Sequence, residues 1–148
     1  MYKHILIATD GSALASRAVA HGVALANDQK AAATIVTVTE SWSAFELARE
    51  ARMGNPNPLA QYETAAANAA KSVLDKAAEV AKSLGVPCNL VHVPDQHPAE
   101  GIVATAKAKG CDLIVMASHG RRGVDKVLIG SRTQEVVTNS PIPVLVVH

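Results

Sequence analysis

Residues 113–131 read Leu-Ile-Val-Met-Ala-Ser-His-Gly-Arg-Arg-Gly-Val-Asp-Lys-Val-Leu-Ile-Gly-Ser. The apolar run 113–116 predicts a buried strand, and residues 132–139 predict a helix. Between these elements lie glycines and basic residues, and a Gly-Ser pair marks the start of the helix. Free backbone N–H groups and the positive end of the dipole at a helix N-terminus attract phosphate. We therefore expect residues 117–131 to form an anion-binding loop.

Strands and helices are expected to alternate along the rest of the chain in the same way. Short apolar or β-branched runs predict strands, and apolar residues that recur every three or four positions predict helices. The expected strands span 4–9, 33–39, 87–93, 113–116 and 144–147, and the expected helices span 12–27, 61–84, 97–109 and 132–139. This order predicts one α/β domain with a parallel sheet that helices cover on both faces.

Residues 40–60 do not fit this alternation. Their large apolar residues stand singly among polar ones, and residues 54–58 contain two prolines and a glycine, which predicts irregular backbone. One or two helical turns fit near residues 44–52. We expect a flexible excursion here, and two interpretations stay open: it covers a ligand, or its apolar residues pack against the edge of the sheet.

Composition sets limits on the class of protein. A chain of 148 residues with 49% hydrophobic and 18% charged residues fits a single domain, 1–148, with a sizeable core. The formal net charge of +1 and the 3% of aromatic residues do not favour nucleic acid or an anionic membrane surface as a partner. No apolar run approaches the roughly 18 residues of a membrane span.

The two cysteines, Cys88 and Cys111, lack the spacing of a zinc site or a disulfide framework. They are expected to be small apolar residues of a protein in a reducing compartment. The N-terminus runs directly into a strand without the pattern of a secretory signal. These observations predict a cytoplasmic protein.

Two expected strands end in residues suited to ligand binding. The first ends in Thr9-Asp10-Gly11-Ser12, and the fourth ends in Ala117-Ser118-His119-Gly120. Open α/β sheets bind ligands beyond the carboxyl ends of their strands, where the strand order reverses. If these strands are neighbours, the Asp10 carboxylate faces the glycine loop and is a candidate for ribose hydroxyls or for a metal such as Mg²⁺ or Mn²⁺. Asp10 is alternatively a turn residue or a helix cap.

At these residues the sequence resembles the universal stress protein family. Three segments carry the resemblance: residues 5–12 (Ile-Leu-Ile-Ala-Thr-Asp-Gly-Ser), residues 112–120 and residues 141–147 (Pro-Ile-Pro-Val-Leu-Val-Val). The nucleotide-binding members of that family carry Gly, two residues, Gly, nine residues and then Gly-Ser or Gly-Thr. Gly120, the nine residues that follow and Gly130-Ser131 match this spacing, whereas Ala117 stands at the first glycine.

The resemblance implies a five-stranded sheet in the order 3-2-1-4-5, a homodimer through Val144–Val147 and, in one subgroup, ATP between strands one and four. By position, adenine and ribose would contact four residues at the ends of the first two strands, Ala8, Thr9, Asp10 and Val38. Ala117, at the end of the fourth strand, would lie beside the ribose. The phosphates would be held by Gly120, Gly130, Ser131 and Arg132. His119, Arg121 and Arg122 are further candidates that could equally face solvent, and the glycines, Gly123 included, could be turn formers only.

The sequence favours a regulatory ATP-binding protein of the stress response with at most slow hydrolysis. The Walker pattern Gly-x-x-x-x-Gly-Lys-Ser/Thr and the pattern Gly-x-Gly-x-x-Gly are absent, and no catalytic residue is assigned. The alternative is a nucleotide-free dimeric interaction protein, and no motif identifies its protein partners. Ala117 bears on this choice, because glycine permits positive φ and close approach, whereas alanine adds a methyl group.

Overall fold

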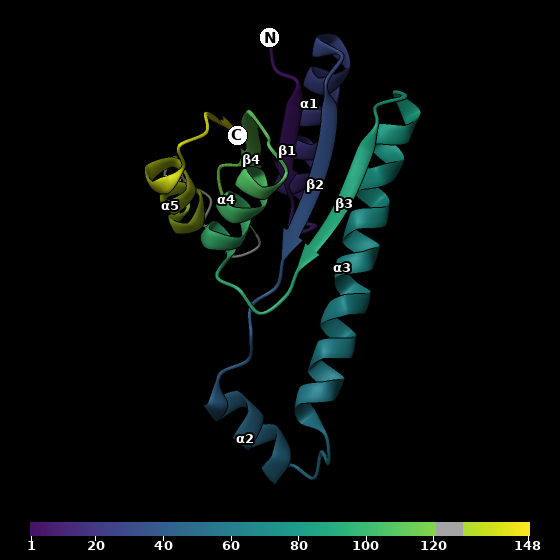
Figure 1. The fold of residues 1–148 in the computed structure, drawn as a ribbon. Helices are drawn as coiled ribbons and strands as arrows, with labels where there is room; N and C mark the ends of the chain where they lie inside the picture. Colours follow the sequence, from purple (N-terminus) through teal and green to yellow (C-terminus); the bar gives the residue numbers. More distant parts are fainter. Residues whose placement is uncertain (121–128) are drawn as a thin grey trace.

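The computed structural model describes residues 1–120 and 129–148 (Figure 1). In this part of the chain five strands and five helices form one α/β unit, which confirms the predicted fold class. The elements in chain order are β1 (His4–Ala8), α1 (Ala13–Gln29), β2 (Ala32–Val38), α2 (Ala44–Arg52), α3 (Pro58–Ser83), β3 (Cys88–Val93), α4 (Pro98–Ala108), β4 (Leu113–Ala117), α5 (Ser131–Asn139) and β5 (Val144–Val147).

The strands pair in parallel in the order β3-β2-β1-β4-β5, as predicted. β1 is central: Ile5 lies opposite Ala33 of β2 on one side and opposite Leu113 of β4 on the other. The chain first adds strands on the β2 side and then crosses to the β4 side. The order therefore reverses between β1 and β4, so their carboxyl ends flank the position where such sheets bind ligands.

Successive residues of the central strands pack into two separate hydrophobic cores, because the side chains of a strand alternate between the two faces of the sheet. Ile5 and Ile7 pack on one face under α1 and α3, and Leu6 packs on the other under α4 and α5. All three side chains have an exposed fraction of 0%. This burial on both faces explains why the sequence of β1 is a continuous apolar run rather than an alternating one.

α2 and the first half of α3 project beyond the carboxyl edge of the sheet (Figure 1). The short helical stretch expected near residues 44–52 is a full helix, which Ser43 and Glu46 open with a reciprocal capping box. α2 contains no buried residue, and Phe45 and Met53 are 77% and 75% exposed. Of the two open interpretations, packing of the apolar residues against the sheet edge does not hold for Phe45 and Met53. That residues 40–60 are flexible or cover a ligand stays a prediction.

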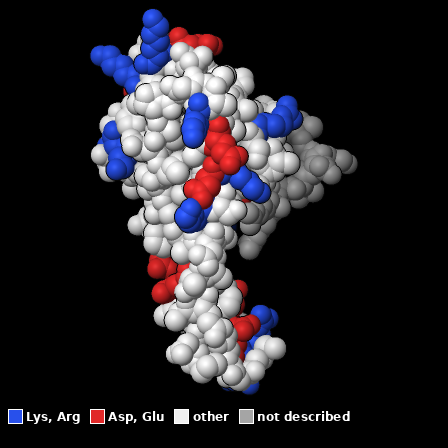
Figure 2. Space-filling view, turned by 90° about the vertical axis from the view of Figure 1, so that its right-hand side faces the viewer, with Lys and Arg blue, Asp and Glu red and all other residues white. Residues whose placement is uncertain are grey.

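Charges of both signs are interleaved on the side of the molecule formed by α3. Figure 2 shows acidic and basic side chains next to one another there, without a patch of one sign. Lys71 and Asp75, one helical turn apart on α3, form one such pair, with 2.6 Å between Nζ and Oδ2. Within residues 1–120 and 129–148, the helices are all too short or too polar to cross a membrane.

Candidate functional site

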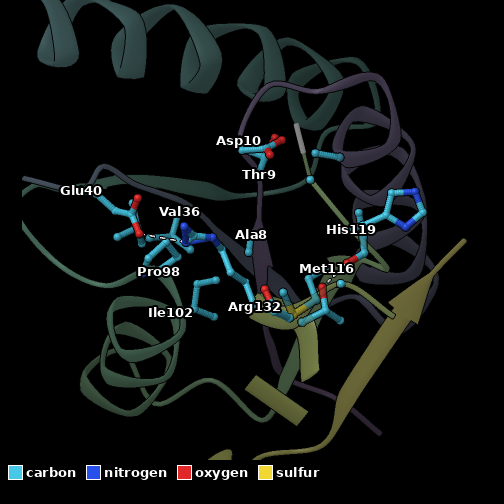
Figure 3. A pocket seen from close by; sticks show the side chains of 17 residues that line it. Ala8, Thr9, Asp10, Val36, Glu40, Pro98, Ile102, Met116, His119 and Arg132 are labelled. Carbon is cyan, nitrogen blue, oxygen red and sulfur yellow. Dashed lines mark hydrogen bonds and ion pairs between the residues drawn. The ribbon is translucent and has the colours of Figure 1, made fainter. Parts of the chain in front are cut away.

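A pocket of about 290 Å³ opens at the carboxyl edge of the sheet, where β1 and β4 lie side by side (Figure 3). Its walls come from the ends of β1, β2 and β4 and from the N-terminal turns of α1, α4 and α5. The structure brings together around this pocket all ten residues that the sequence analysis selected: Ala8, Thr9, Asp10, Val38, Ala117, His119, Gly120, Gly130, Ser131 and Arg132. The candidates Arg121, Arg122 and Gly123 lie outside the described residues.

The pocket also has walls that the sequence analysis missed. These further lining residues are Ala15, Val36, Glu40, Pro98, Ile102, Met116 and Thr133. Glu40 comes two residues after β2, and Pro98 opens α4, so both lie at the same carboxyl edge as the selected residues. The predicted strand order contained this information, because it places the end of β2 beside the end of β1.

One half of the pocket is apolar and ends at the open backbone of Val38. Val36, Ile102 and Met116 line this half. Thr9 N–H donates to the Val36 carbonyl at 3.0 Å, whereas Thr39 N–H donates in the opposite direction, to the Val93 carbonyl of β3 at 2.9 Å. Backbone groups alternate in direction along a parallel strand. The N–H and C=O of Val38 therefore point to the β1 side, beyond the end of that strand and toward the pocket.

Asp10 combines a turn role with a position beside the glycine loop. Its Oδ1 accepts a hydrogen bond from Ser12 N–H at 2.9 Å, and the Ser12 hydroxyl accepts one from Ala15 N–H at 3.2 Å, which caps α1. The other oxygen, Oδ2, lies so close to Gly120 that a Cβ atom there would overlap it. Asp10 is therefore a turn residue, as one of the two interpretations expected. The hydrogen bond within this turn also holds its carboxylate at the wall of the pocket.

The start of α5 forms the opposite end of the pocket. Gly130 N–H donates to the Ser118 carbonyl at 2.7 Å, and the Thr133 hydroxyl donates to the Ala117 carbonyl at 2.8 Å, so α5 is fastened to the end of β4. Gly130 is the N-cap residue and has no side chain with which to cap the N–H groups of the first turn. These groups are therefore available to an anion.

Ala117 has ordinary strand geometry. It pairs with Val147 in the β4–β5 ladder, and its side chain is only 7% exposed. Among the described residues other than glycine, positive φ angles occur at Lys30 and Asp95, not at Ala117. Alanine is therefore unstrained at the position where the nucleotide-binding pattern has its first glycine.

Arg132 and Glu40 form an ion pair across the apolar side of the pocket (Figure 3), with 2.8 Å between Nη1 and Oε1. His97 connects this pair to α5: its Nδ1 lies 3.9 Å from Glu40 Oε1 and its Nε2 lies 2.6 Å from Glu135 Oε2. Tyr62 of α3 donates its hydroxyl hydrogen to the Glu40 carbonyl. Glu40 therefore connects the pocket with the projecting α2–α3 segment.

Two aromatic rings support this connection. Trp42 and Tyr62 stack with 4.4 Å between ring centroids. Burial, followed by the negative charges of Asp95, Glu40 and Glu46, raises the pKa of Tyr62 above its ordinary value. The phenol therefore keeps its proton and remains a donor to the Glu40 carbonyl at neutral pH.

His119 is a further polar residue of the pocket, and its Nδ1 lies 3.2 Å from the Ser118 hydroxyl oxygen. Its ring points away from the Glu40–Arg132 pair (Figure 3). In the part of the chain that the structure describes, no three His, Cys, Asp or Glu side chains gather into a metal site. The Asp10 carboxylate alone fits a Mg²⁺ ion that takes its other ligands from phosphates and water.

The fold and the pocket define an open parallel α/β protein with a pocket at the reversal of strand order. The profile of the Universal stress protein family matches residues 1–148. The chain belongs to this family.

Comparisons with individual proteins agree with this assignment. A universal stress protein of Thermus aquaticus is 36% identical over 152 residues, which cover 100% of both chains. The solved structure of MJ0577, a protein of Methanocaldococcus jannaschii, superposes with a TM-score of 0.80 at 28% identity, over 99% of this chain and 96% of the other. A universal stress protein solved in complex with cAMP superposes with a TM-score of 0.70 at 26% identity, over 99% and 97% of the two chains.

Proposed function

We propose that this protein binds an adenine nucleotide, ATP in the first place, and acts as a nucleotide-dependent regulator in the stress response. The observation that carries the proposal is the composition of one pocket. An apolar half with the open backbone of Val38 lies next to a polar half formed by Asp10 and the uncapped start of α5. This is the arrangement that a base, a ribose and a phosphate chain require in sequence.

The apolar half suits adenine. The backbone N–H of Val38 would donate to the ring nitrogen N1, and its carbonyl would accept from the exocyclic amino group. Guanine presents its donor and acceptor in the opposite order on that edge. Val36 and Met116 would pack on the base. We therefore expect ATP to bind more tightly than GTP.

The polar half suits ribose and phosphates. Asp10 would accept hydrogen bonds from ribose hydroxyls or hold Mg²⁺ or Mn²⁺ together with phosphate oxygens. The N–H groups of Ser131 and Arg132 and the Ser131 hydroxyl would receive the phosphates. A bound metal would neutralise phosphate charge. We assign no catalytic residue and expect at most slow hydrolysis of ATP.

The relative solved with cAMP supports an adenosine nucleotide as the class of ligand. If the protein is instead a nucleotide-free interaction protein, which is the alternative, the pocket binds no nucleotide. We further propose that the chain forms a homodimer through β5 and functions in the cytoplasm, where its two free thiols, Cys88 and Cys111, would stay reduced.

The test is to identify nucleotide that co-purifies with the protein by mass spectrometry and to titrate the stripped protein with ATP and GTP by calorimetry. We expect ATP to bind at least about tenfold more tightly than GTP. If the protein carries no nucleotide and shows no ATP affinity in the millimolar range, the proposal is wrong.

A steric variant locates the phosphates. A Cβ atom on Gly130 would lie 3.0 Å from His119 Cβ and 3.2 Å from the Ser118 carbonyl oxygen, so Gly130→Val forces the start of α5 away from the end of β4. It should remove ATP binding while the far-ultraviolet circular dichroism spectrum stays unchanged. Ala67→Val on the exposed face of α3 is the matched control. Unchanged ATP affinity in Gly130→Val would place the phosphates elsewhere.

A further inference from the structure

Arg132 has a second possible partner within the proposed site. Of the residues that the structure describes, it is the only Lys or Arg that lines the pocket, and its guanidinium is engaged by Glu40 at 2.8 Å. Building on the proposed nucleotide site, we propose that Glu40 holds Arg132 for exchange: the guanidinium leaves the carboxylate for the phosphate chain when a polyphosphate binds. The pair would thereby make the affinity of the site depend on the number of phosphates.

The position of Arg132 permits this exchange. It is the second residue of α5, so its Cα lies at the helix end where an anion would sit. Side chains of a helix lean toward its N-terminus, which brings a first-turn arginine within reach of such an anion. Figure 3 shows the side chain directed instead toward Glu40, with Asp10 on another side of the pocket. Rotation about the arginine side-chain bonds suffices to change partner.

The strengths of the two interactions favour the exchange. The side chains of Arg132 and Glu40 are 38% and 42% exposed, and ion pairs with this access to water contribute little. A guanidinium that donates two parallel hydrogen bonds to a phosphate makes a stronger, charge-assisted contact. Adenosine has no phosphate and leaves the pair intact, whereas ATP displaces it.

Glu40 would not follow Arg132 into the site. Its carbonyl accepts the Tyr62 hydroxyl, and its carboxylate retains a neighbour in His97, 3.9 Å away. His97 is held in turn by Glu135 at 2.6 Å. The Glu40 backbone is thus tied to α3 and its carboxylate keeps a neighbour, and Arg132 is the partner that moves.

Charge on the described part of the pocket wall favours the exchange when a polyphosphate binds. Asp10 and Glu40 are both acidic, and Arg132 is the single Lys or Arg among the described lining residues. While Arg132 stays on Glu40, an entering triphosphate meets a neutralised guanidinium and the carboxylate of Asp10. When the guanidinium leaves Glu40, it supplies a positive charge to the bound phosphates.

The experiment measures dissociation constants for ATP, adenosine and inorganic tripolyphosphate by calorimetry, with the whole protein. Glu40→Gln should tighten ATP and tripolyphosphate binding about threefold, because the competing partner is lost, and leave adenosine unchanged. Arg132→Gln should weaken both phosphate ligands about tenfold, again without an effect on adenosine. Glu100→Gln, which removes a carboxylate from the exposed start of α4, controls for the change in net charge.

The double variant separates exchange from simple repulsion. If Glu40 acts through Arg132, Glu40→Gln has no effect in the Arg132→Gln background. If the threefold gain persists there, Glu40 merely repels phosphate and the proposal is overturned. Equal effects on ATP and adenosine would overturn it as well.

Tripolyphosphate distinguishes this proposal from the one on which it rests. Failure of ATP and adenosine to bind, with tripolyphosphate still responding to Glu40→Gln through Arg132, would refute the nucleotide site alone. Binding of all three ligands without any response to Glu40→Gln would refute the exchange alone. If none of the three ligands binds any variant, both proposals are wrong.

Discussion

Gly120 and Asp10 approach each other more closely than any side chain at position 120 allows. A Cβ atom there would overlap Asp10 Oδ2, while Oδ1 is held by Ser12 N–H at 2.9 Å. Gly120→Ala should therefore displace the carboxylate and weaken ATP binding about tenfold, the cost of roughly one charge-assisted hydrogen bond. Calorimetric titration measures this change.

A double-mutant cycle identifies the cause. Gly120→Ala should have no further effect on ATP affinity in an Asp10→Ala background, where the overlapping oxygen is gone. A full loss of affinity in that background would show that the glycine itself contacts the ligand.

Ala117→Gly tests the departure from the nucleotide-binding pattern. Ala117 is a buried residue of β4 in ordinary strand geometry, so glycine gains no needed conformation and adds only flexibility to the unfolded chain. We expect the free energy of unfolding to fall by about 0.5–1 kcal/mol, measured by urea denaturation. ATP affinity should change less than about threefold. A tenfold gain in affinity would instead show that the methyl group obstructs the ribose.

The sequence predicted those residues of the pocket wall that directly follow a central strand. Asp10 and Gly120 were selected because apolar runs end beside them, and the structure places both at one pocket. Glu40 was missed as a pocket residue although the expected strand order places the end of β2 beside the end of β1. Its contacts with Arg132, His97 and Tyr62 could not be predicted, because these partners are far from it in the chain and leave no spacing pattern.

Asp112 joins two elements at the opposite, amino-terminal edge of the sheet. Its carboxylate accepts hydrogen bonds from the backbone N–H groups of Lys3 at 2.8 Å and His4 at 3.1 Å, at the start of β1, and Asp112 itself directly precedes β4. Burial raises the pKa of Asp112, but these N–H groups and the nearby His4 ring lower it more, so the net pKa is below its ordinary value. The ionised form is therefore favoured by folding.

Asp112→Asn should lower the free energy of unfolding by about 1 kcal/mol at pH 7. A depressed carboxyl pKa contributes stability that is complete above about pH 4 and lost as the pH falls through the folded-state value. The difference between the two proteins should thus shrink on acidification, measured by thermal unfolding across pH. Asp28→Asn, at an exposed site, should not lower stability. A difference that persists undiminished at pH 2 would contradict this account.

The starts of α2 and α3 show which helix boundaries can be predicted from the sequence. α3 begins at Pro58, three residues before the expected start, because proline at the first turn lacks only an N–H that has no helical partner. α2 was expected as a turn or two, although Ser43 and Glu46 have the spacing of a capping box that predicts a helix start. The range expected for it, near residues 44–52, agrees with the observed helix. Its projection away from the sheet leaves no buried stripe, so periodicity gave no further support.

The apolar runs of β1 and β4 predict central strands, because such runs are buried on both faces of a sheet. The complete strand order was implied only by the resemblance to the family, since the equally apolar run of β5 lies at an edge. Among the residues that the structure describes, β3 and β5 are the two edge strands of the sheet, and each has one strand neighbour only. The more apolar edge, β5, is a hazard unless another chain pairs with it. This is the physical reason for the proposed homodimer, in which a two-fold axis would place two β5 strands side by side.

The ladder identifies which backbone groups of β5 are free for such pairing. Ile114 N–H donates to the Pro143 carbonyl at 2.9 Å, and Ser118 N–H donates to the Val147 carbonyl at 2.8 Å. Since direction alternates along the strand, the N–H of Val146 points away from β4. Val146→Pro removes this outward N–H without loss of a bond to β4, and edge strands tolerate such a proline. Sedimentation velocity should show a dimer for the unmodified protein and a monomer for the variant.

Leu90→Pro provides the matched control on the other edge. In β3 the Pro87 and Val93 carbonyls accept from β2, so by the same alternation the N–H of Leu90 points outward. This variant should remain dimeric, and thermal unfolding must show that both variants are folded. A monomeric unmodified protein at micromolar concentration would rule out the homodimer. A dimer that survives Val146→Pro but not Leu90→Pro would place the interface on β3, and the apolar face of β5 would then need another partner.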